Sequence, residues 1–441
     1  MLKLIEKFTE KFVEKTKDKG IIVISHFDTD GVTSAAIFSK CLKRLDKNFS
    51  VRIIKQLENK IIQELPEDKI IVFLDLASAS LEEIGKIPNQ VFIIDHHDLS
   101  GKVPSNVEIV NPHLTDSENM SASCLTYLVS KQISKENIDS GNLAVIGLVG
   151  DILDRDIGKI TNTIISDSGT IIKKGILLYP STRPLNKTLE YSSNPFIPGV
   201  TGNSEGAVEL LREAGIETTK KGYKSLIELD EHEMRKLVTA VVLRTAKKSS
   251  NFDFIGNLFL IKFFNKLEDA REISALINAC SRMGYSEIAL LLCMGNKSAK
   301  EKSERIYATY KQHIIGALNF VNTNDLIKGK KYIIINAKDN IKDTIIGTIA
   351  SILSMSPVYE EGTVILAMAY NKDKIKVSAR ISGRNKQEEK NLKELMDSIV
   401  EHTGGIAGGH KFAAGCLISK EKEEMFIELA KKKMEIELIK I

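Results

Sequence analysis

The sequence predicts an α/β protein with an N-terminal domain built on a parallel sheet, an inserted mostly helical unit, and a smaller α/β domain at the C-terminal end. Two observations indicate this class. Over roughly the first 155 residues, short apolar runs alternate with helical segments, which is typical of βαβ units in a parallel sheet. The runs are apolar throughout, as expected for strands that are buried on both faces.

Five strands separated by helical segments are expected in the N-terminal domain, at 21–26, 51–55, 69–75, 91–95 and 107–111. Residues 156–190 fit a helical continuation of this domain. From 191 to about 205 the chain is rich in Ser, Asn, Pro and Gly, which marks a boundary or an exposed loop. We therefore place the first domain at residues 1–190.

Amphipathic patterns predict several helices in the middle of the chain, at 206–215, 231–248, 267–284 and 299–320. They fit an inserted, mainly helical domain over residues 191–328, after which residues 329–441 return to an α/β pattern. The elements expected there are strands at 332–336, 363–370 and 374–381, helices at 343–354 and 387–402, and then a glycine-rich loop, a strand and a final helix.

Composition narrows the function classes. A formal net charge of +4 is low for a dedicated non-specific DNA-binding protein, so any nucleic-acid contact would use a local basic surface. The five cysteines are scattered, which argues against a disulfide framework or a zinc ribbon and for a reducing compartment. Without a signal-peptide pattern or an apolar run of about 20 residues, we expect a cytoplasmic protein that does not associate with membranes.

The most informative segment is Ser-His-Phe-Asp-Thr-Asp-Gly at 25–31, which follows a strand-like apolar run. In an extended chain, alternate residues point to the same side, so His26, Asp28 and Asp30 would converge on one point. Such groups repel and desolvate one another unless a cation lies between them. The segment therefore indicates a metal site, with a solvated Asp-x-Asp-Gly turn as the alternative.

Further apolar runs end in the same kind of group. One run leads into Asp75, another leads into Asp95-His96-His97, and Asp151 lies inside an apolar stretch where an unpaired carboxylate is costly. In an open parallel sheet, the ligand crevice lies beyond the carboxyl ends of the strands. We therefore expect these side chains to gather at one edge of the sheet.

A second candidate site lies near the C-terminal end, where glycines occupy positions 404, 405, 408 and 409. Glycines let backbone N–H groups approach an anion closely. His410 and Arg380 could add charged donors to a phosphate. A glycine-rich turn is by itself a weak signal, because such turns are common.

Together, the segment at 25–31, the strand end at Asp75, Asp-His-His at 95–97 and Gly-Asp at 150–151 resemble the DHH phosphoesterase superfamily. The segment at 404–415 is similar to the glycine-rich signature of the DHH-associated C-terminal domain. The combination most resembles the archaeal RecJ-like nucleases, some of which associate with the GINS replication complex.

The resemblance implies two metal ions, bridged by Asp75, with oxygen-rich ligation that suits Mn²⁺ or Mg²⁺ better than zinc. The implied ligands are His26 and Asp28 for one ion, and Asp30, His96 and Asp151 for the other.

Three further residues receive supporting roles from the resemblance. Asp95 would orient His96, and His97 would donate to a phosphoryl oxygen. His113 would tune the site or contact substrate, and a simple turn histidine is an equal alternative. Where relatives often have glycine, this chain has Ala77, and we expect metal binding to tolerate it.

The implied activity is a Mn²⁺-dependent exonuclease that trims single-stranded DNA, RNA or both from an end, in the cleft between the domains. The glycine-rich segment, Arg380 and His410 would grip a substrate phosphate about one nucleotide from the metals. One alternative is a phosphoesterase for small substrates, either nanoRNA or 3′-phosphoadenosine 5′-phosphate. Another is a binding role, in which the inserted helices dock GINS or another replication or RNA-processing protein.

Overall fold

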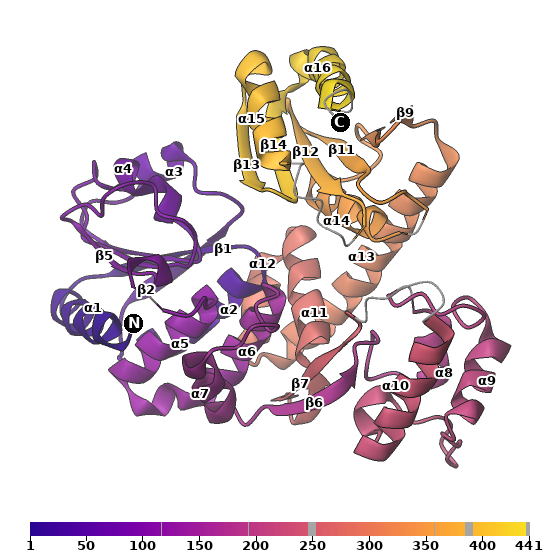
Figure 1. Ribbon diagram of the computed structural model, residues 1–441. Helices are drawn as coiled ribbons and strands as arrows, with labels where there is room; N and C mark the ends of the chain where they lie inside the picture. Colours follow the sequence, from indigo (N-terminus) through magenta and orange to yellow (C-terminus); the bar gives the residue numbers. More distant parts are fainter. Residues whose placement is uncertain (116, 193, 246–252, 357, 384–390, 438–441) are drawn as a thin grey trace. The chain divides into compact units, whose positions relative to one another are not determined.

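A computed structural model describes the chain except for residues 116, 193, 246–252, 357, 384–390 and 438–441 (Figure 1). The last residues of the expected helix 231–248 and the first of the expected helix 387–402 lie outside the described residues. The chain divides into two compact units, Met1–Glu304 and Arg305–Ile441, and the division falls within α13 (Lys297–Thr323).

The first unit is built on a five-stranded parallel sheet in the order β2-β1-β3-β4-β5. The strands are β1 (Ile21–His26), β2 (Phe49–Ile54), β3 (Ile70–Leu74), β4 (Val91–Ile94) and β5 (Val107–Val110). The expected α/β class with a parallel N-terminal sheet is thus confirmed. Side chains of β3 and β4 are buried on both faces, which explains their uninterrupted apolar sequences.

Helices cover both faces of this sheet (Figure 1). One face carries α1 (Leu2–Lys15), α2 (Thr29–Arg44) and α5 (Ala122–Ile133), and the other carries the short helices α3 (Asn59–Gln63) and α4 (Leu81–Ile84). On the first face, Phe12 lies edge-on to both Phe38 and Phe92, with ring centroids 5.3 and 5.1 Å apart. These contacts fix α1 and α2 against the middle of the sheet.

The strand order determines where a ligand can bind. The chain passes from β1 outward to β2 and then returns to β3 on the opposite side of β1, so the direction of winding reverses between β1 and β3. Crevices form at such a reversal, beyond the carboxyl ends of the strands. His26 ends β1 and Asp75 directly follows β3, so both lie at this point.

The rest of the first unit is mainly helical. Its helices are α6 (Gly141–Gly150), α7 (Lys159–Asp167), α8 (Leu185–Glu190), α9 (Ser204–Glu213), α10 (Glu231–Thr245), α11 (Ala270–Arg282) and α12 (Ser286–Cys293). Apolar side chains of α8, α9 and α10, including Leu189, Leu210 and Leu237, form a separate core.

A three-stranded antiparallel sheet in this region corrects the sequence prediction. It consists of β6 (Ile171–Ile176), β7 (Ile255–Phe263) and β8 (Lys266–Asp269), where only helical or unassigned segments were expected. The β7–β8 turn has Phe264 and Asn265 at φ 46° and 63°. Two such residues make a hairpin turn that usually contains glycine, so the ordinary sequence signal of a hairpin is missing here.

The second unit contains a six-stranded mixed sheet in the order β13-β14-β12-β11-β10-β9. Its strands are β9 (Ile327–Gly329), β10 (Tyr332–Asn336), β11 (Val364–Asn371), β12 (Lys374–Ile381), β13 (Ile406–His410) and β14 (Ala413–Ser419). One face packs against α14 (Asp343–Ser354), and the other packs against α15 (Leu392–Thr403) and α16 (Glu423–Glu437). The expected α/β C-terminal domain is therefore present.

The glycine-rich segment was expected to be a loop, and the structure corrects this. Residues 406–410 form edge strand β13, which pairs with β14 in antiparallel register. Glycines are unfavourable in strands, which is why the sequence did not predict one. Among the described residues, no helix combines the length and the apolar composition needed to cross a membrane.

Candidate metal centre

The first three candidate ligands come from a strand-to-helix turn. His26 is the last residue of β1, Asp28 is the N-cap of α2, and Asp30 lies in the first turn of that helix. Helix α2 begins at Thr29, so the extended alternation expected from the sequence does not continue past the strand. The three side chains consequently divide between two neighbouring groups instead of converging on one point.

Close approach of strand and helix makes this turn possible. A Cβ atom on Gly31 would lie 2.3 Å from the carbonyl oxygen of His26, so only glycine fits there. Ser25 Oγ donates to the Gly31 carbonyl oxygen at 2.7 Å, and the Gly31 N–H donates to Asp28 Oδ1 at 3.0 Å. The glycine of the sequence motif therefore positions both the strand end and the N-cap carboxylate.

Asp75 lies at the centre of the arrangement. Its Oδ2 is 3.3 Å from His26 Nδ1, and its Oδ1 is 3.4 Å from His96 Nε2. Around it are two groups whose ligand atoms lie within 4.8 Å of one another: His26 with Asp28 and Asp75, and Asp30 with His96 and Asp151. Asp75, His96 and His97 form a third, overlapping group. The sequence-predicted ligands are thus brought together, with Asp75 facing both groups.

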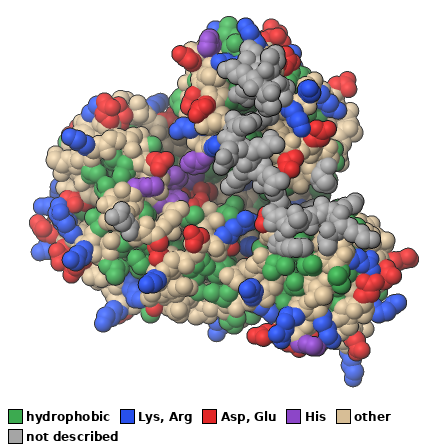
Figure 2. All heavy atoms as spheres, viewed as in Figure 1, with side chains coloured by type: hydrophobic (Ala, Val, Ile, Leu, Met, Phe, Trp, Pro, Cys, Tyr) green, Lys and Arg blue, Asp and Glu red, His purple; other side chains and the backbone are tan. Residues whose placement is uncertain are grey.

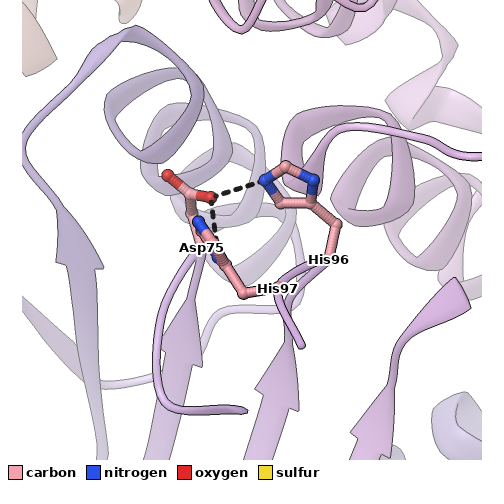
Figure 3. A group of neighbouring side chains, drawn as sticks. All are labelled: Asp75, His96 and His97. Carbon is pink, nitrogen blue, oxygen red and sulfur yellow. Dashed lines mark ion pairs between the residues drawn. The ribbon is translucent and has the colours of Figure 1, made fainter. Parts of the chain in front are cut away.

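Figure 3 shows one oxygen of Asp75 directed at the rings of both His96 and His97. Asp75 has a left-handed backbone, with φ 58°. Ala77, two residues later, has φ 95°, a conformation that glycine adopts with less strain. Figure 2 shows histidine side chains gathered beside acidic ones on this face of the N-terminal unit.

Asp30 also anchors a helix. Its Oδ2 accepts from the Ala122 N–H at 2.7 Å and its Oδ1 accepts from the Ser123 N–H at 3.0 Å, both at the start of α5. A carboxylate is favourable there because the first N–H groups of a helix have no partner within it. Gly147 makes room for this contact, since a Cβ there would lie 2.6 Å from Asp30 Oδ1.

Two buried polar atoms indicate whether a cation would fit between these side chains. Asp75 Oδ1 and His96 Nε2 face each other, and neither has a hydrogen-bond partner among the described residues. Unpartnered buried polar atoms are costly, and a shared cation would satisfy both. Four carboxylates and two imidazoles form a donor set that suits Mn²⁺ or Mg²⁺. The residues present therefore fit a divalent metal centre.

The pKa shifts of the candidate ligands also show that negative charge is concentrated at this point. Burial, reinforced by Asp28 and Asp30, raises the pKa of Asp75 well above its usual value. Burial and the Asp30 carboxylate raise the pKa of Asp151 to about 7. Burial opposes a charge on His26, but Asp28 and Asp75 outweigh it and raise the pKa of His26 well above its usual value. Bound cations would replace these protons.

Asp95 holds the Asp-His-His turn, although with a different ring from the one expected. Its Oδ1 lies 2.7 Å from Nδ1 of His97 and accepts from the His96 backbone N–H at 2.8 Å. Its Oδ2 accepts from the Ser78 N–H at 3.0 Å. The hydrogen bond to Asp95 is the main cause that raises the pKa of His97 above its usual value. Asp95 thus orients the ring of His97.

His113 lies apart from these groups. It is exposed in the short turn after β5, with its Nε2 3.6 Å from Asp98 Oδ1. The preceding Asn111 is buried, and its side chain donates to the carbonyl oxygen of His97 at 2.9 Å and to Ser78 Oγ at 3.0 Å. Sequence reasoning missed this residue as a support for His97. Its position directly after a strand was the available signal.

The residues predicted to bind phosphate lie in the second unit. Arg380 in β12 and His410 in β13 both lie directly opposite Ala413 of β14, so their side chains project from the same face of the sheet. Arg380 Nε donates to Ser351 Oγ at 3.1 Å, and His410 is exposed.

The glycines of this segment have different backbone requirements. Gly404, Gly405 and Gly409 have φ values of 72°, 121° and 123°, which explains why glycine stands at each position. At Gly408, a Cβ would meet nothing within 4 Å. The fold does not require glycine there.

Fold and site together define an α/β protein with a candidate divalent-metal centre where the winding of its parallel sheet reverses, and with a separate mixed-sheet unit. Three segments of the chain match models of known protein families. Residues 20–150 match the N-terminal domain of the DHH family, residues 178–259 match the DHH-CID domain, and residues 329–435 match the DHHA1 domain. These cover most of the chain, which belongs to the DHH superfamily.

An uncharacterized protein of Methanocaldococcus jannaschii is 28% identical over 97% of this chain and 96% of its own length. Among solved structures, Cdc45 from Entamoeba histolytica covers 98% of both chains with a TM-score of 0.67 and 13% identity. An exonuclease RecJ bound to manganese covers 97% of this chain and 94% of its own, with a TM-score of 0.61 and 16% identity.

RecJ from Thermus thermophilus, in complex with Mn²⁺, has a TM-score of 0.62 and 17% identity over 98% of this chain. The chain spans about half the length of that protein, 54%. At these identities the structural neighbours show a RecJ-like fold.

Proposed function

We propose that this protein is a metal-dependent phosphodiesterase that acts as a single-strand-specific exonuclease on DNA, RNA or both. The observation that carries the proposal is the position of Asp75, whose two oxygens face two different ligand groups. Asp75 would therefore be able to serve two divalent cations, one at each group. The manganese-bound exonuclease RecJ among the structural neighbours supports the choice of activity and of Mn²⁺, with Mg²⁺ as a second option.

The proposed ligands divide as the two groups do. His26 and Asp28 would hold one ion, Asp30, His96 and Asp151 would hold the other, and Asp75 would serve both. When bound, a pair of divalent cations supplies positive charge for the phosphoryl oxygens and lowers the pKa of a water molecule. The protein's own part is to fix the ligand positions, through the strand ends and through the hydrogen bonds of Asp28 and Asp30.

His97 has the position of a phosphate donor. Its side chain is half exposed beside Asp75, and Asp95 keeps its Nδ1 in a hydrogen bond. The Asp95 carboxylate favours the protonated ring, whose Nε2–H is then available to donate to a phosphoryl oxygen. We assign His113 no part in the ligand sets and keep it as a candidate for outer contacts with substrate.

We propose that the second unit binds a substrate phosphate through the face that carries Arg380 and His410. Gly408 lies on this segment without a backbone reason for being glycine, which is consistent with a surface kept open for a ligand. Gly404, Gly405 and Gly409 shape the strand around it. Binding of a phosphate at a distance from the cut bond favours trimming from an end.

We keep the division into a catalytic domain at 1–190, an inserted domain at 191–328 and a substrate-binding domain at 329–441 as part of the proposal. The DHH-CID match and the fold shared with Cdc45 make docking of GINS or another replication or RNA-processing protein a proposed second role for the inserted domain. It is compatible with catalysis.

The test is a time course with Mn²⁺ on single-stranded DNA and RNA of matched sequence, labelled at either end, with Asp151→Asn as the inactive control. Progressive shortening from one end, absent in the control, is expected. Intact oligomers with rapid hydrolysis of dinucleotides or of 3′-phosphoadenosine 5′-phosphate would replace the exonuclease by a small-substrate phosphoesterase. No hydrolysis of any substrate would overturn the enzymatic proposal and leave partner binding.

A further inference from the structure

A pocket of about 890 Å³ opens in the first unit, and residues next to the candidate ligand Asp151 in the chain form part of its lining. Val149 and Ile152, which flank Asp151 on either side in the chain, line it. Ser274 of α11 also lines it, and its carbonyl oxygen accepts a hydrogen bond from Thr29 Oγ1 at 3.0 Å. The pocket therefore shares its wall with the turns that carry Asp151 and the N-terminal end of α2.

The lining is not built for a phosphate. Its charged residues are Asp154, Asp253, Arg155 and Arg271, whose formal charges cancel. The Arg271 guanidinium is already bound by Asp269, with Nε donating at 3.0 Å, and by the carbonyl oxygens of neighbouring residues. A site for an anion would present an excess of free donors. This pocket instead presents a neutral surface.

The uncharged lining combines aromatic rings with amides. The rings belong to Tyr179, Tyr191 and Phe254, and the amides belong to Asn194, Asn257 and Asn278. Flat aromatic side chains stack on nucleobases, and amide side chains can donate to and accept from base edges. A pocket of this size lies within the range of about 300–1,000 Å³ that small ligands occupy. The chemistry matches a nucleobase with its sugar.

Ile152 adds an unusual apolar contact at this pocket. It has φ 60°, a strained conformation for a β-branched residue, and 67% of it is exposed. It directly follows Asp151, so the turn that presents the carboxylate to the metal centre also presents an apolar side chain to the pocket. Tyr191 is likewise 69% exposed. Neither side chain belongs to the protein core.

We propose that this pocket binds one unpaired nucleobase of the strand whose phosphodiester lies at the metal centre. The inference rests on the proposed nuclease function and adds the source of its strand specificity. A base enters such a pocket only when it is neither paired nor stacked in a duplex. The pocket therefore selects single strands, and it recognises a base independently of the phosphate-binding face of the second unit.

The test uses end-labelled single strands with one abasic residue placed at successive positions from the end. Cleavage by the native protein, Tyr191→Ala and Asn278→Ala is compared with cleavage by Tyr285→Ala, a tyrosine variant outside the pocket. Tyr285 is 45% exposed, so its replacement controls for loss of a surface ring. A labelled oligomer that is abasic at every position, which carries no ring able to stack in the pocket, reports on the metal centre without the pocket.

For the native protein, an abasic residue at one position should lower kcat/KM by roughly tenfold, the scale of one base stacked on an aromatic ring. Tyr191→Ala and Asn278→Ala should lower kcat/KM on intact strands. On the strand with the abasic residue at that position they should add little further loss, and they should cleave the fully abasic oligomer as the native protein does. Equal cleavage of intact and abasic strands by all variants would overturn the pocket while leaving the nuclease in place.

If no strand is cut, the proposed function fails, and binding of the same labelled strands then decides the pocket. A roughly tenfold weaker Kd for the abasic strand, matched by Tyr191→Ala, would support a nucleobase site. Equal Kd values for intact and abasic strands would overturn it.

Discussion

The metal centre of the first unit and the glycine-rich strand of the second represent two ways of preparing a site for phosphate chemistry. The first gathers carboxylates at one point, where burial, reinforced by the neighbouring negative charges, raises the pKa values of Asp75 and Asp151. The second presents glycines and the exposed side chain of His410 on an edge strand, with the half-buried Arg380 on the same face of the sheet. The carboxylate cluster therefore needs bound cations to offset its charge, whereas the glycine-rich strand is stable without a ligand and leaves room for one to approach.

The largest expected effect is a loss of kcat/KM when the metal centre is changed at Asp75. Asp75→Asn keeps the side-chain volume but removes the charge shared by both ligand groups. We expect kcat/KM to fall by about 10³-fold or more, because several kcal/mol of metal-derived stabilisation are lost. Hydrolysis of labelled single strands measures it, with Asp18→Asn, an exposed carboxylate outside the ligand sets, as control. Near-native activity would contradict the bridging role of Asp75.

The second prediction is that the stabilisation of the protein by Mn²⁺ depends on pH. In the metal-free protein, a folded-state pKa of about 7 for Asp151 lies above its unfolded value, so its contribution to stability is present at low pH and is lost as the pH rises through 7. Mn²⁺ should therefore stabilise the protein more at pH 8 than at pH 5.5. At 100 times the Kd, the gain is about 2.7 kcal/mol.

Thermal unfolding with EDTA and with Mn²⁺ across this pH range measures the effect. A stabilisation independent of pH would contradict the replacement of protons by cations at the ligand carboxylates. Asp151→Asn should remove much of this pH dependence. That result would show that the pH dependence arises at the candidate metal centre and not from surface groups.

Changes on the face that carries Arg380 and His410 should raise KM and should leave the stabilisation by Mn²⁺ unchanged. His410→Ala should raise KM by about 10- to 100-fold, the scale of a hydrogen bond to a charged group, and Arg380→Ala should act in the same direction. Gly408→Ala should raise KM while leaving stability unchanged. Gly409→Ala should lower stability, because a Cβ there would lie 2.5 Å from the Ala413 carbonyl oxygen. Unchanged KM values for His410→Ala and Arg380→Ala would remove the proposed grip.

The smallest effect concerns Ala77. Its φ of 95° is strained for alanine, so Ala77→Gly should raise the free energy of unfolding by about 0.5 kcal/mol, after the greater chain entropy of glycine is subtracted. Chemical denaturation measures it. A destabilised variant would show that the left-handed backbone at 77 costs less than the added chain entropy.

Much of the N-terminal fold could be predicted, because uninterrupted apolar strands and polar strand ends leave few alternatives. The expected strand 91–95 and the observed β4 at Val91–Ile94 differ by one residue. The β6–β8 sheet could not be predicted, because Phe264 and Asn265 form its turn without a glycine. The expected convergence of His26, Asp28 and Asp30 on one point was wrong, because helix α2 begins at Thr29 and places Asp30 in a separate group from the other two.

The hydrogen bonds of Asp30 affect the choice of an inactive variant for trapping a substrate complex. Both oxygens of this carboxylate accept N–H groups at the start of α5, with Gly147 packed against them. Replacement by alanine would remove a ligand and loosen a helix at once, so a failed crystal or a weak complex would have two causes. A trapping variant is better made at Asp151, whose carboxylate lies at the candidate metal centre, 3.4 Å from His96 Nε2.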